Sequence, residues 1–167
     1  MIYVFLADGF EEIEALAPTD ILRRAGLDVK LCGIGCKKIK GVNGIEITCD
    51  TEISEAEQDL DAVILPGGMP GAENLFKSER LREIVNHCAK SNKLVAAICA
   101  APIILGRLGL LEGKNACCYP APDLEKELKG AKMLDKPVCV DGNIVTSKGP
   151  GTSLEFGFKI AEILKGS

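Results

Sequence analysis

The sequence predicts an α/β fold in which a mostly parallel sheet carries helices on both faces. Short apolar runs alternate with amphipathic segments along all 167 residues. Repeated strand–helix–strand units make neighbouring strands parallel, because each crossover returns over a face of the sheet. With 47% hydrophobic residues and no linker, repeat or low-complexity tract, residues 1–167 are expected to form a single domain.

Apolar runs and their stop signals define the elements of the first half. Gly26 ends an amphipathic segment, Asn43-Gly44 is a turn signal, and Pro66 ends an apolar run. The expected elements are a strand at 2–7, a helix at 11–25, a strand at 28–33, a small β-hairpin excursion at 38–49 and a buried strand at 61–65.

The second half continues the alternation and closes with a hairpin and a helix. Pro102 suits the first turn of a helix, and Asp141-Gly142-Asn143 is a hairpin turn. The expected elements are a helix at 79–91, a strand at 94–98, a helix at 101–108, a strand at 115–119, a short helix at 123–129, hairpin strands at 137–140 and 144–146, and a last helix at 152–164.

Composition argues against several classes of partner. The net charge of −4 gives no electrostatic basis for binding nucleic acid, and no segment reaches the roughly 18 apolar residues of a membrane span. The first apolar run has no basic lead, so a cytoplasmic protein is expected. Most of the eight cysteines lie in apolar runs without the spacing of a disulfide framework or a zinc site, so no metal is expected.

Cys99 is the first candidate for chemistry. It stands where the strand at 94–98 stops and Pro102 marks a helix start, a position like the nucleophile elbow of a hydrolase. The carboxyl ends of parallel strands face the ligand crevice, and the positive end of a helix lowers the pKa of a thiol. We therefore expect a reactive cysteine.

Two further signals lie where they can meet Cys99. On a helical wheel Glu14 shares the apolar stripe with Phe10 and Ile13, whereas Glu12 points the other way with Arg23. A carboxyl in such a stripe is costly unless it is paired or protonated. The sequence Pro66-Gly67-Gly68 follows another strand, and the alternative interpretation is an ordinary turn. It lacks the spacing of a nucleotide-binding loop, so nucleotide binding is weakly supported.

These elements all follow strands at the same sheet edge, so they are expected to form one site. A protonated Glu14 would donate a hydrogen bond to the Cys99 thiolate, and the Gly68 and Ala100 amides would form an oxyanion-binding pair. The one histidine, His87, lies late in the helix at 79–91, on the expected solvent-facing flank. A Cys–His dyad is therefore disfavoured, and any base is expected to be a carboxylate, the thiolate or water.

At these residues the chain resembles the ThiJ/PfpI superfamily, in particular the branch of the parkinsonism-associated deglycase and its bacterial relatives. The resemblance covers nearly the whole chain and rests on four ordered motifs. It implies a flavodoxin-like three-layer sandwich, a homodimer, Cys99 as the reactive thiol, Glu14 as its protonated partner, and Gly68 and Ala100 as amide donors. The motifs are 8–14 (DGFEEIE), 65–68 (LPGG), 96–102 (AAICAAP) and 146–152 (TSKGPGT).

Three positions depart from patterns within this superfamily. Tyr119 stands where the branch often has a histidine proposed to assist catalysis, and Lys148 replaces a frequent arginine, losing bidentate anion binding. Ala100 follows the nucleophile where the protease-like branch has a histidine, so peptidase activity is disfavoured. Tyr119 and Lys148 are therefore secondary site candidates. Gly67, in the motif at 65–68, is a third.

The resemblance implies a cofactor-free enzyme acting on reactive carbonyls, of the glyoxalase or deglycase type on methylglyoxal and glyoxal adducts. The substrate would be a small-molecule carbonyl, with no nucleic acid or membrane partner. The alternative is a redox-sensing or stress-chaperone protein whose Cys99 is oxidised to a sulfinate with little turnover. A third possibility is a relative whose site has drifted, as the tyrosine at position 119 allows.

Overall fold

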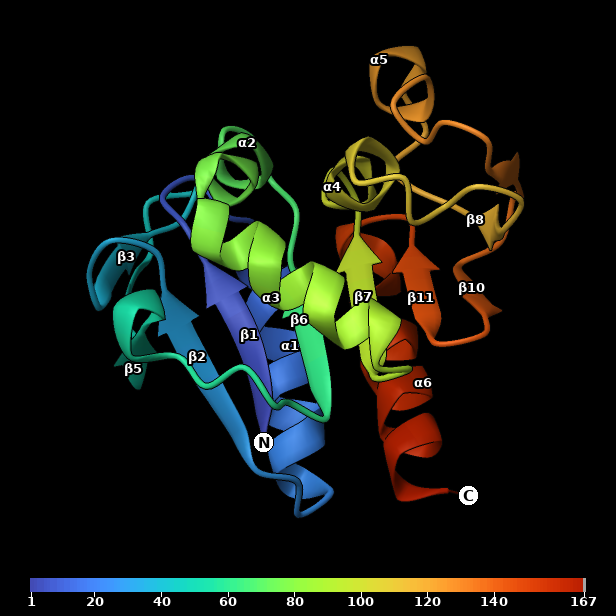
Figure 1. Cartoon of the computed structure of the whole chain (residues 1–167). Helices are drawn as coiled ribbons and strands as arrows, with labels where there is room; N and C mark the ends of the chain where they lie inside the picture. The colour runs from blue at the N-terminus through green and yellow to red at the C-terminus, as the bar shows by residue number, and fades with distance from the viewer. Residues whose placement is uncertain (167) are drawn as a thin grey trace.

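A central sheet organises the molecule, for which a computed structural model describes residues 1–166 (Figure 1). Its seven strands follow the order β10-β11-β7-β6-β1-β2-β5, and every neighbouring pair is parallel except β10 with β11. The strands are β1 (Ile2–Leu6), β2 (Val29–Gly33), β5 (Thr51–Glu52), β6 (Ala62–Leu65), β7 (Leu94–Ile98), β10 (Val138–Asp141) and β11 (Ile144–Ser147).

Helices cover both faces of this sheet and divide the core in two. Alternate side chains of β1 point to opposite faces, so Tyr3 and Phe5 belong to one apolar cluster while Val4 and Leu6 belong to the other. This three-layer arrangement confirms the predicted fold class. One face carries α1 (Glu12–Arg24) and α6 (Ser153–Lys165), and the other carries α2 (Gly71–Lys77), α3 (Glu79–Lys90) and α4 (Pro102–Arg107) (Figure 1).

Short elements outside the sheet differ most from the prediction. The strand expected at 115–119 is only two residues long, since the chain turns away after Ala116. Helix α2 is not among the predicted elements; its seven residues begin at Gly71, inside the glycine-rich run that follows β6. The remaining elements are the hairpin β3 (Lys38–Lys40) and β4 (Glu46–Thr48), the pair β8 (Asn115–Ala116) and β9 (Lys132–Met133), α5 (Pro122–Glu125), and the 3₁₀ turns at Ile53–Glu55 and Pro150–Thr152.

The buried stripe of α1 is rotated from the predicted one. Ile13 was placed on the apolar face, yet it is 54% exposed, while Glu14, Ala15 and Leu22 are fully buried. The helix packs against the sheet on one side and α6 on another, so a wheel with a single apolar centre does not describe it. Burial of Glu14, the residue that matters for the site, is as predicted.

Glu12 is also buried, by the hairpin rather than by the sheet. Its carboxylate accepts hydrogen bonds from the backbone N–H groups of Asn43 at 2.9 Å and Ile45 at 3.1 Å. Burial acts to raise the pKa of Glu12, but these N–H groups, with the Asn43 amide, lower it below its ordinary value. The sequence places Glu12 on the outer face of α1. In the structure the hairpin covers that face, because the Glu12 carboxylate accepts the hydrogen bonds of the N–H groups in the hairpin turn.

We predict that Glu12→Ala destabilises the protein by about 2 kcal/mol, the usual cost of hydrogen bonds to a charged group. The loss arises because two backbone donors of the turn keep no protein partner. Urea unfolding followed by circular dichroism measures it. Glu55→Ala, at an exposed position, is the control and should change the free energy of unfolding by less than about 0.5 kcal/mol. Equal effects of the two variants would contradict this role of Glu12.

Candidate active site

Cys99 sits in a strained turn between β7 and α4. Its φ of 66° lies in the left-handed region, which non-glycine side chains rarely adopt. Both of its backbone groups are held there: the N–H donates to the Ser147 carbonyl at 2.9 Å, and the carbonyl accepts from the Tyr119 N–H at 2.9 Å. The elbow expected from the sequence is therefore present, and the thiol is partly exposed.

The carboxyl of Glu14 reaches the same point from α1. Its Oε1 accepts a hydrogen bond from the Gly67 N–H at 2.9 Å, while Oε2 is buried without a hydrogen-bond partner among the described residues. A Cβ on Gly67 would lie 2.7 Å from both Glu14 Oε1 and the Cys99 Cβ, and 2.8 Å from the Ala100 nitrogen. Only glycine fits at position 67. These short distances show that β6, β7 and α1 converge at one site.

The Glu14 carboxyl exchanges its proton near neutral pH. Burial raises the pKa of Glu14 to about 7, against the opposing effect of the neighbouring Cys99 thiol. The charge of Glu11 raises this pKa further, and the Gly67 N–H lowers it. Glu11 is close because it caps α1, its carboxylate accepting from the Glu14 N–H at 2.8 Å. The unpartnered Oε2 is the atom available to carry the proton.

The environment of the sulfur corrects one expectation from the sequence. Burial raises the pKa of the Cys99 thiol, and an ionised Glu14 raises it further. The predicted lowering by the end of a helix is wrong: α4 has only six residues, and the N–H groups that lower the pKa belong to Gly68 and Ala100. A protonated Glu14 removes the charge repulsion, so thiol and carboxyl form one unit with coupled protonation.

Gly68 brings its N–H toward the sulfur through a conformation that favours glycine. Its φ is 88°, and a Cβ there would lie 2.6 Å from both the Glu11 nitrogen and the Gly9 carbonyl oxygen. The tight packing of these loops places the Gly68 amide beside the Ala100 amide at Cys99. Together they provide two fixed donors where negative charge would develop on or near the sulfur.

The secondary candidates lie at different distances from this centre. Tyr119 donates its backbone N–H to Cys99, and its half-exposed ring lies beside Gly149. Lys148 forms an ion pair with the exposed carboxylate of Asp135, which occupies the charge suggested for anion binding. Lys148 is therefore paired with Asp135, a residue outside the Cys99–Glu14 pair.

His87 lies on α3 and takes no part in the site. Its Nε2 is 3.1 Å from the carboxylate of Asp59, on the side of the sheet opposite α1. The carboxyl of Glu14 is therefore the acid or base in contact with the thiol. Among residues 1–166, no group of three or more histidine, cysteine or acidic side chains has the arrangement of a metal site, and no helix is long and apolar enough to cross a membrane.

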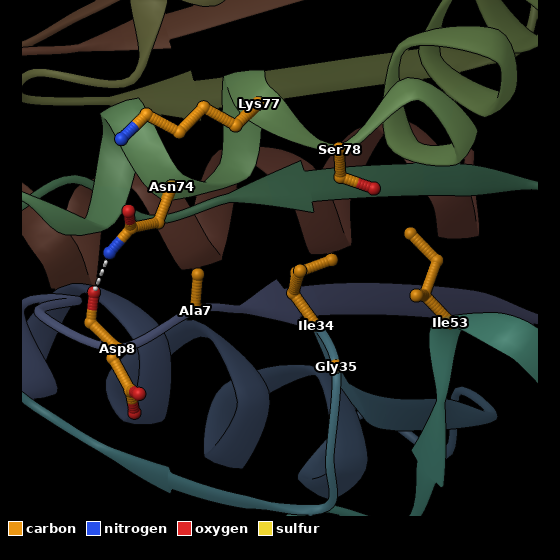
Figure 2. A pocket seen from close by; sticks show the side chains of 8 residues that line it. All are labelled: Ala7, Asp8, Ile34, Gly35, Ile53, Asn74, Lys77 and Ser78. Carbon is orange, nitrogen blue, oxygen red and sulfur yellow. Dashed lines mark hydrogen bonds between the residues drawn. The ribbon is translucent and has the colours of Figure 1, made fainter.

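A pocket that the sequence did not reveal opens at the same sheet edge (Figure 2). Its volume is about 550 Å³, and its lining includes the ends of β1 and β2 but neither Cys99 nor Glu14. Asn74 crosses its rim and donates to the Asp8 carbonyl at 2.9 Å. Asn74 and Lys77 belong to α2, the helix that was not predicted, so no pattern pointed to them.

Comparisons with known proteins agree with this geometry. The model of the DJ-1/PfpI family matches residues 1–163. Protein dj-1beta of Drosophila melanogaster is 38% identical over 165 residues, covering 98% of this chain and 88% of the relative. A Caenorhabditis elegans relative named glutathione-independent glyoxalase DJR-1.2 is 36% identical over 157 residues, covering 93% and 83% of the two chains.

A solved structure shows the same fold. Oxidized Toxoplasma gondii DJ-1 superposes with a TM-score of 0.92 at 36% identity, covering 98% of this chain and 89% of that one. Sequence and structure therefore lead to one conclusion: the chain belongs to the DJ-1/PfpI family.

Proposed function

We propose that the protein is a cofactor-free, cysteine-dependent enzyme that acts on reactive carbonyls such as methylglyoxal and glyoxal adducts. The observation that supports this most is the contact of Cys99 with a carboxyl whose pKa is raised to about 7. General acid–base catalysis works best when the pKa of the group lies near the working pH. Gly68 and Ala100 add two fixed N–H donors.

The first chemical step is formation of a hemithioacetal. With the proton that the pair shares on Glu14, the Cys99 thiolate attacks the aldehyde carbon, the carbon–oxygen π bond breaks, and the oxygen takes the proton from Glu14. The Gly68 and Ala100 amides stabilise the charge that the oxygen carries before protonation. Glu14, now a carboxylate, can accept a proton in the next step.

For methylglyoxal the balanced outcome is addition of one water to give lactate. Glu14 moves the hydrogen of the thiol-bearing carbon to the neighbouring carbonyl carbon, and the hydroxyl proton of the hemithioacetal passes to the oxygen of that carbonyl, which leaves a thioester of a 2-hydroxy acid. Water then cleaves this thioester and restores the thiol. The name of the Caenorhabditis elegans relative, a glutathione-independent glyoxalase, supports this class of reaction.

A second candidate is a redox-sensing or stress-chaperone protein with little turnover. Among the described residues, six cysteines are buried, Cys36 is exposed and Cys99 is partly exposed. Peroxide can therefore reach the Cys99 thiol. Oxidation to a sulfinate would place oxygens where Glu14 can donate a hydrogen bond. The solved structure of Toxoplasma gondii DJ-1 is of the oxidized protein, which supports this second candidate.

We further propose that the chain acts as a homodimer. Apolar side chains are exposed on α1, on the hairpin that Glu12 holds, and on α6, which packs beside α1. Exposed apolar patches of this kind mark interaction surfaces. Because α1 also carries Glu14, a second copy on this face would limit access of water to the site. The exposed side chains are Ile13, Val42, Ile45 and Leu154.

Cys99→Ala should abolish formation of lactate from methylglyoxal, with a loss of at least about 100-fold in kcat/KM. The reason is that the sulfur forms the covalent intermediate. Pure protein, methylglyoxal and a lactate assay are sufficient. Cys36→Ala, which removes the exposed thiol, is the matched control and should retain turnover within about two-fold.

Turnover that survives in Cys99→Ala would disprove the mechanism. If wild-type protein has no turnover, and mild peroxide adds two oxygen atoms to Cys99 alone in intact-mass and peptide analysis, the redox-sensing alternative is supported instead. Uniform oxidation of the cysteines would support neither function.

Glu14→Gln should change how stability depends on pH. A carboxyl whose folded pKa is raised stabilises the folded state fully below its ordinary value of 4.5, and this contribution is lost as the pH rises through about 7. Relative to wild type, the variant should therefore gain about 3 kcal/mol in unfolding free energy between pH 4 and pH 8.5. Urea titrations across this range measure the gain, and Glu155→Gln, at an exposed position, is the control. A pH-independent difference would show that Glu14 is not protonated by burial.

Leu154→Glu should shift the dimer toward monomer by at least about ten-fold in Kd, because it puts a charge in the exposed apolar patch. Sedimentation equilibrium gives the masses. Lys90→Glu places a negative side chain on the exposed side of α3, over the other face of the sheet, and should leave the mass unchanged. A wild-type protein that sediments as a monomer at all concentrations would rule the proposal out.

A further inference from the structure

Two cysteines outside the Cys99 site are brought together by the end of the sheet. Cys117 follows β8, and Cys139 lies in β10, 22 positions later in the chain. Both are buried: the exposed fraction of the surface is 1% for Cys117 and 3% for Cys139. The two side chains interact with one another, and β8 packs against β10. The proposed carbonyl chemistry uses neither of them.

Strand register explains why the two thiols meet. Cys139 of β10 is paired directly with Thr146 of β11, so their side chains share one face of the hairpin. Cys117 docks on the same threonine: its N–H donates to Thr146 Oγ1 at 3.0 Å, and its sulfur lies 3.7 Å from that oxygen. Thr146 therefore holds both cysteines on one side of the sheet.

A positive charge lies near the pair. The ammonium group of Lys148, two residues beyond Thr146, interacts electrostatically with both Cys117 and Cys139. Burial raises the pKa of the Cys117 thiol to about 12, and the charge of Lys148 acts against this shift, toward the thiolate that reacts with peroxides and sulfenic acids. Asp135 faces the same ammonium and partly neutralises it.

The location offers a route for oxidant despite burial. β10 is the edge strand of the seven-stranded sheet and pairs with β11 alone in that sheet. In Figure 1 the segment from β8 through α5 to β10 lies beside this edge as a lobe of short elements. Edges of this kind open locally more readily than central strands, so access to the pair depends on transient opening.

We propose that Cys117 and Cys139 are a modification site, which hydrogen peroxide converts to an intrachain disulfide. One thiol attacks peroxide, the O–O bond breaks, and a sulfenic acid and one water form. The second thiol then attacks the sulfenic sulfur: the S–S bond forms, the S–O bond breaks, and the hydroxide leaves as a second water with the proton of that thiol. Two thiols lose two electrons, and peroxide is reduced to two waters.

The crosslink would act on the wall of the Cys99 site. Cys117 is two residues before Tyr119, whose N–H holds the Cys99 carbonyl at 2.9 Å. The disulfide therefore fastens the segment that anchors the strained elbow to the edge strand. Cys118 is also buried, but its thiol donates to the Tyr119 carbonyl at 3.3 Å, so it serves as the matched control.

Non-reducing peptide mapping tests the site. Folded wild-type protein is treated with hydrogen peroxide, unfolded in N-ethylmaleimide and digested with trypsin. The expected product joins the tryptic peptides 115–126 and 133–148, with two hydrogens less than their summed mass and one N-ethylmaleimide added on Cys118. Cys118→Ala should keep this product, whereas Cys117→Ala and Cys139→Ala should each lose it.

Thermal unfolding provides a second readout that needs no variant. Closing a loop of this length should raise the midpoint by about 5 °C or more, and dithiothreitol should reverse the rise. A sulfinate on Cys99 is not reduced by dithiothreitol, so the reversible part reports the disulfide. A link between Cys117 and Cys118, a link that persists in Cys139→Ala, or fully alkylated Cys117 and Cys139 after peroxide would overturn the proposal.

Discussion

The hydrogen bond from the Gly67 N–H to the buried Glu14 carboxyl is the interaction on which the site depends. It joins α1 to the end of β6 and fixes a carboxyl that also interacts with the thiol at the end of β7, while its second oxygen has no hydrogen-bond partner among the described residues. A side chain on Gly67 would collide with Glu14, Cys99 and Ala100 together. The absence of a Cβ at Gly67 thus lets β6, β7 and α1 approach closely enough for the Glu14 carboxyl to contact the Cys99 thiol.

Neighbouring glutamates support this contact in different ways. Glu11 caps α1 through the Glu14 N–H, and Glu12 fastens the hairpin over the outer face of the helix. Three nearly consecutive carboxyls are thus buried, each with a different set of N–H donors. The pKa of Glu12 falls and that of Glu14 rises because Glu12 receives several N–H donors while burial dominates at Glu14.

The strain at Cys99 is balanced by the sheet around it. Its backbone hydrogen bonds run to Ser147, at the end of β11, and to Tyr119, in the segment after β8. The second segment is also where Cys117 meets Cys139 and Thr146. The proposed oxidation at the sheet edge and the proposed chemistry at the elbow would therefore be connected through a few backbone hydrogen bonds.

The sequence by itself determined the layers of the fold and the principal pair of the site. Apolar runs ending in Gly or Pro located β1, β6 and β7, and a carboxyl in an apolar segment identified Glu14, because local patterns reflect local burial. Only the tertiary structure decided what depends on contacts between distant segments. These include the exposure of Ile13, the burial of Glu12 under the hairpin, the raised pKa of Cys99 and the pairing of Cys117 with Cys139. Helical periodicity gives the direction of a side chain, but the element that covers it comes from elsewhere in the chain.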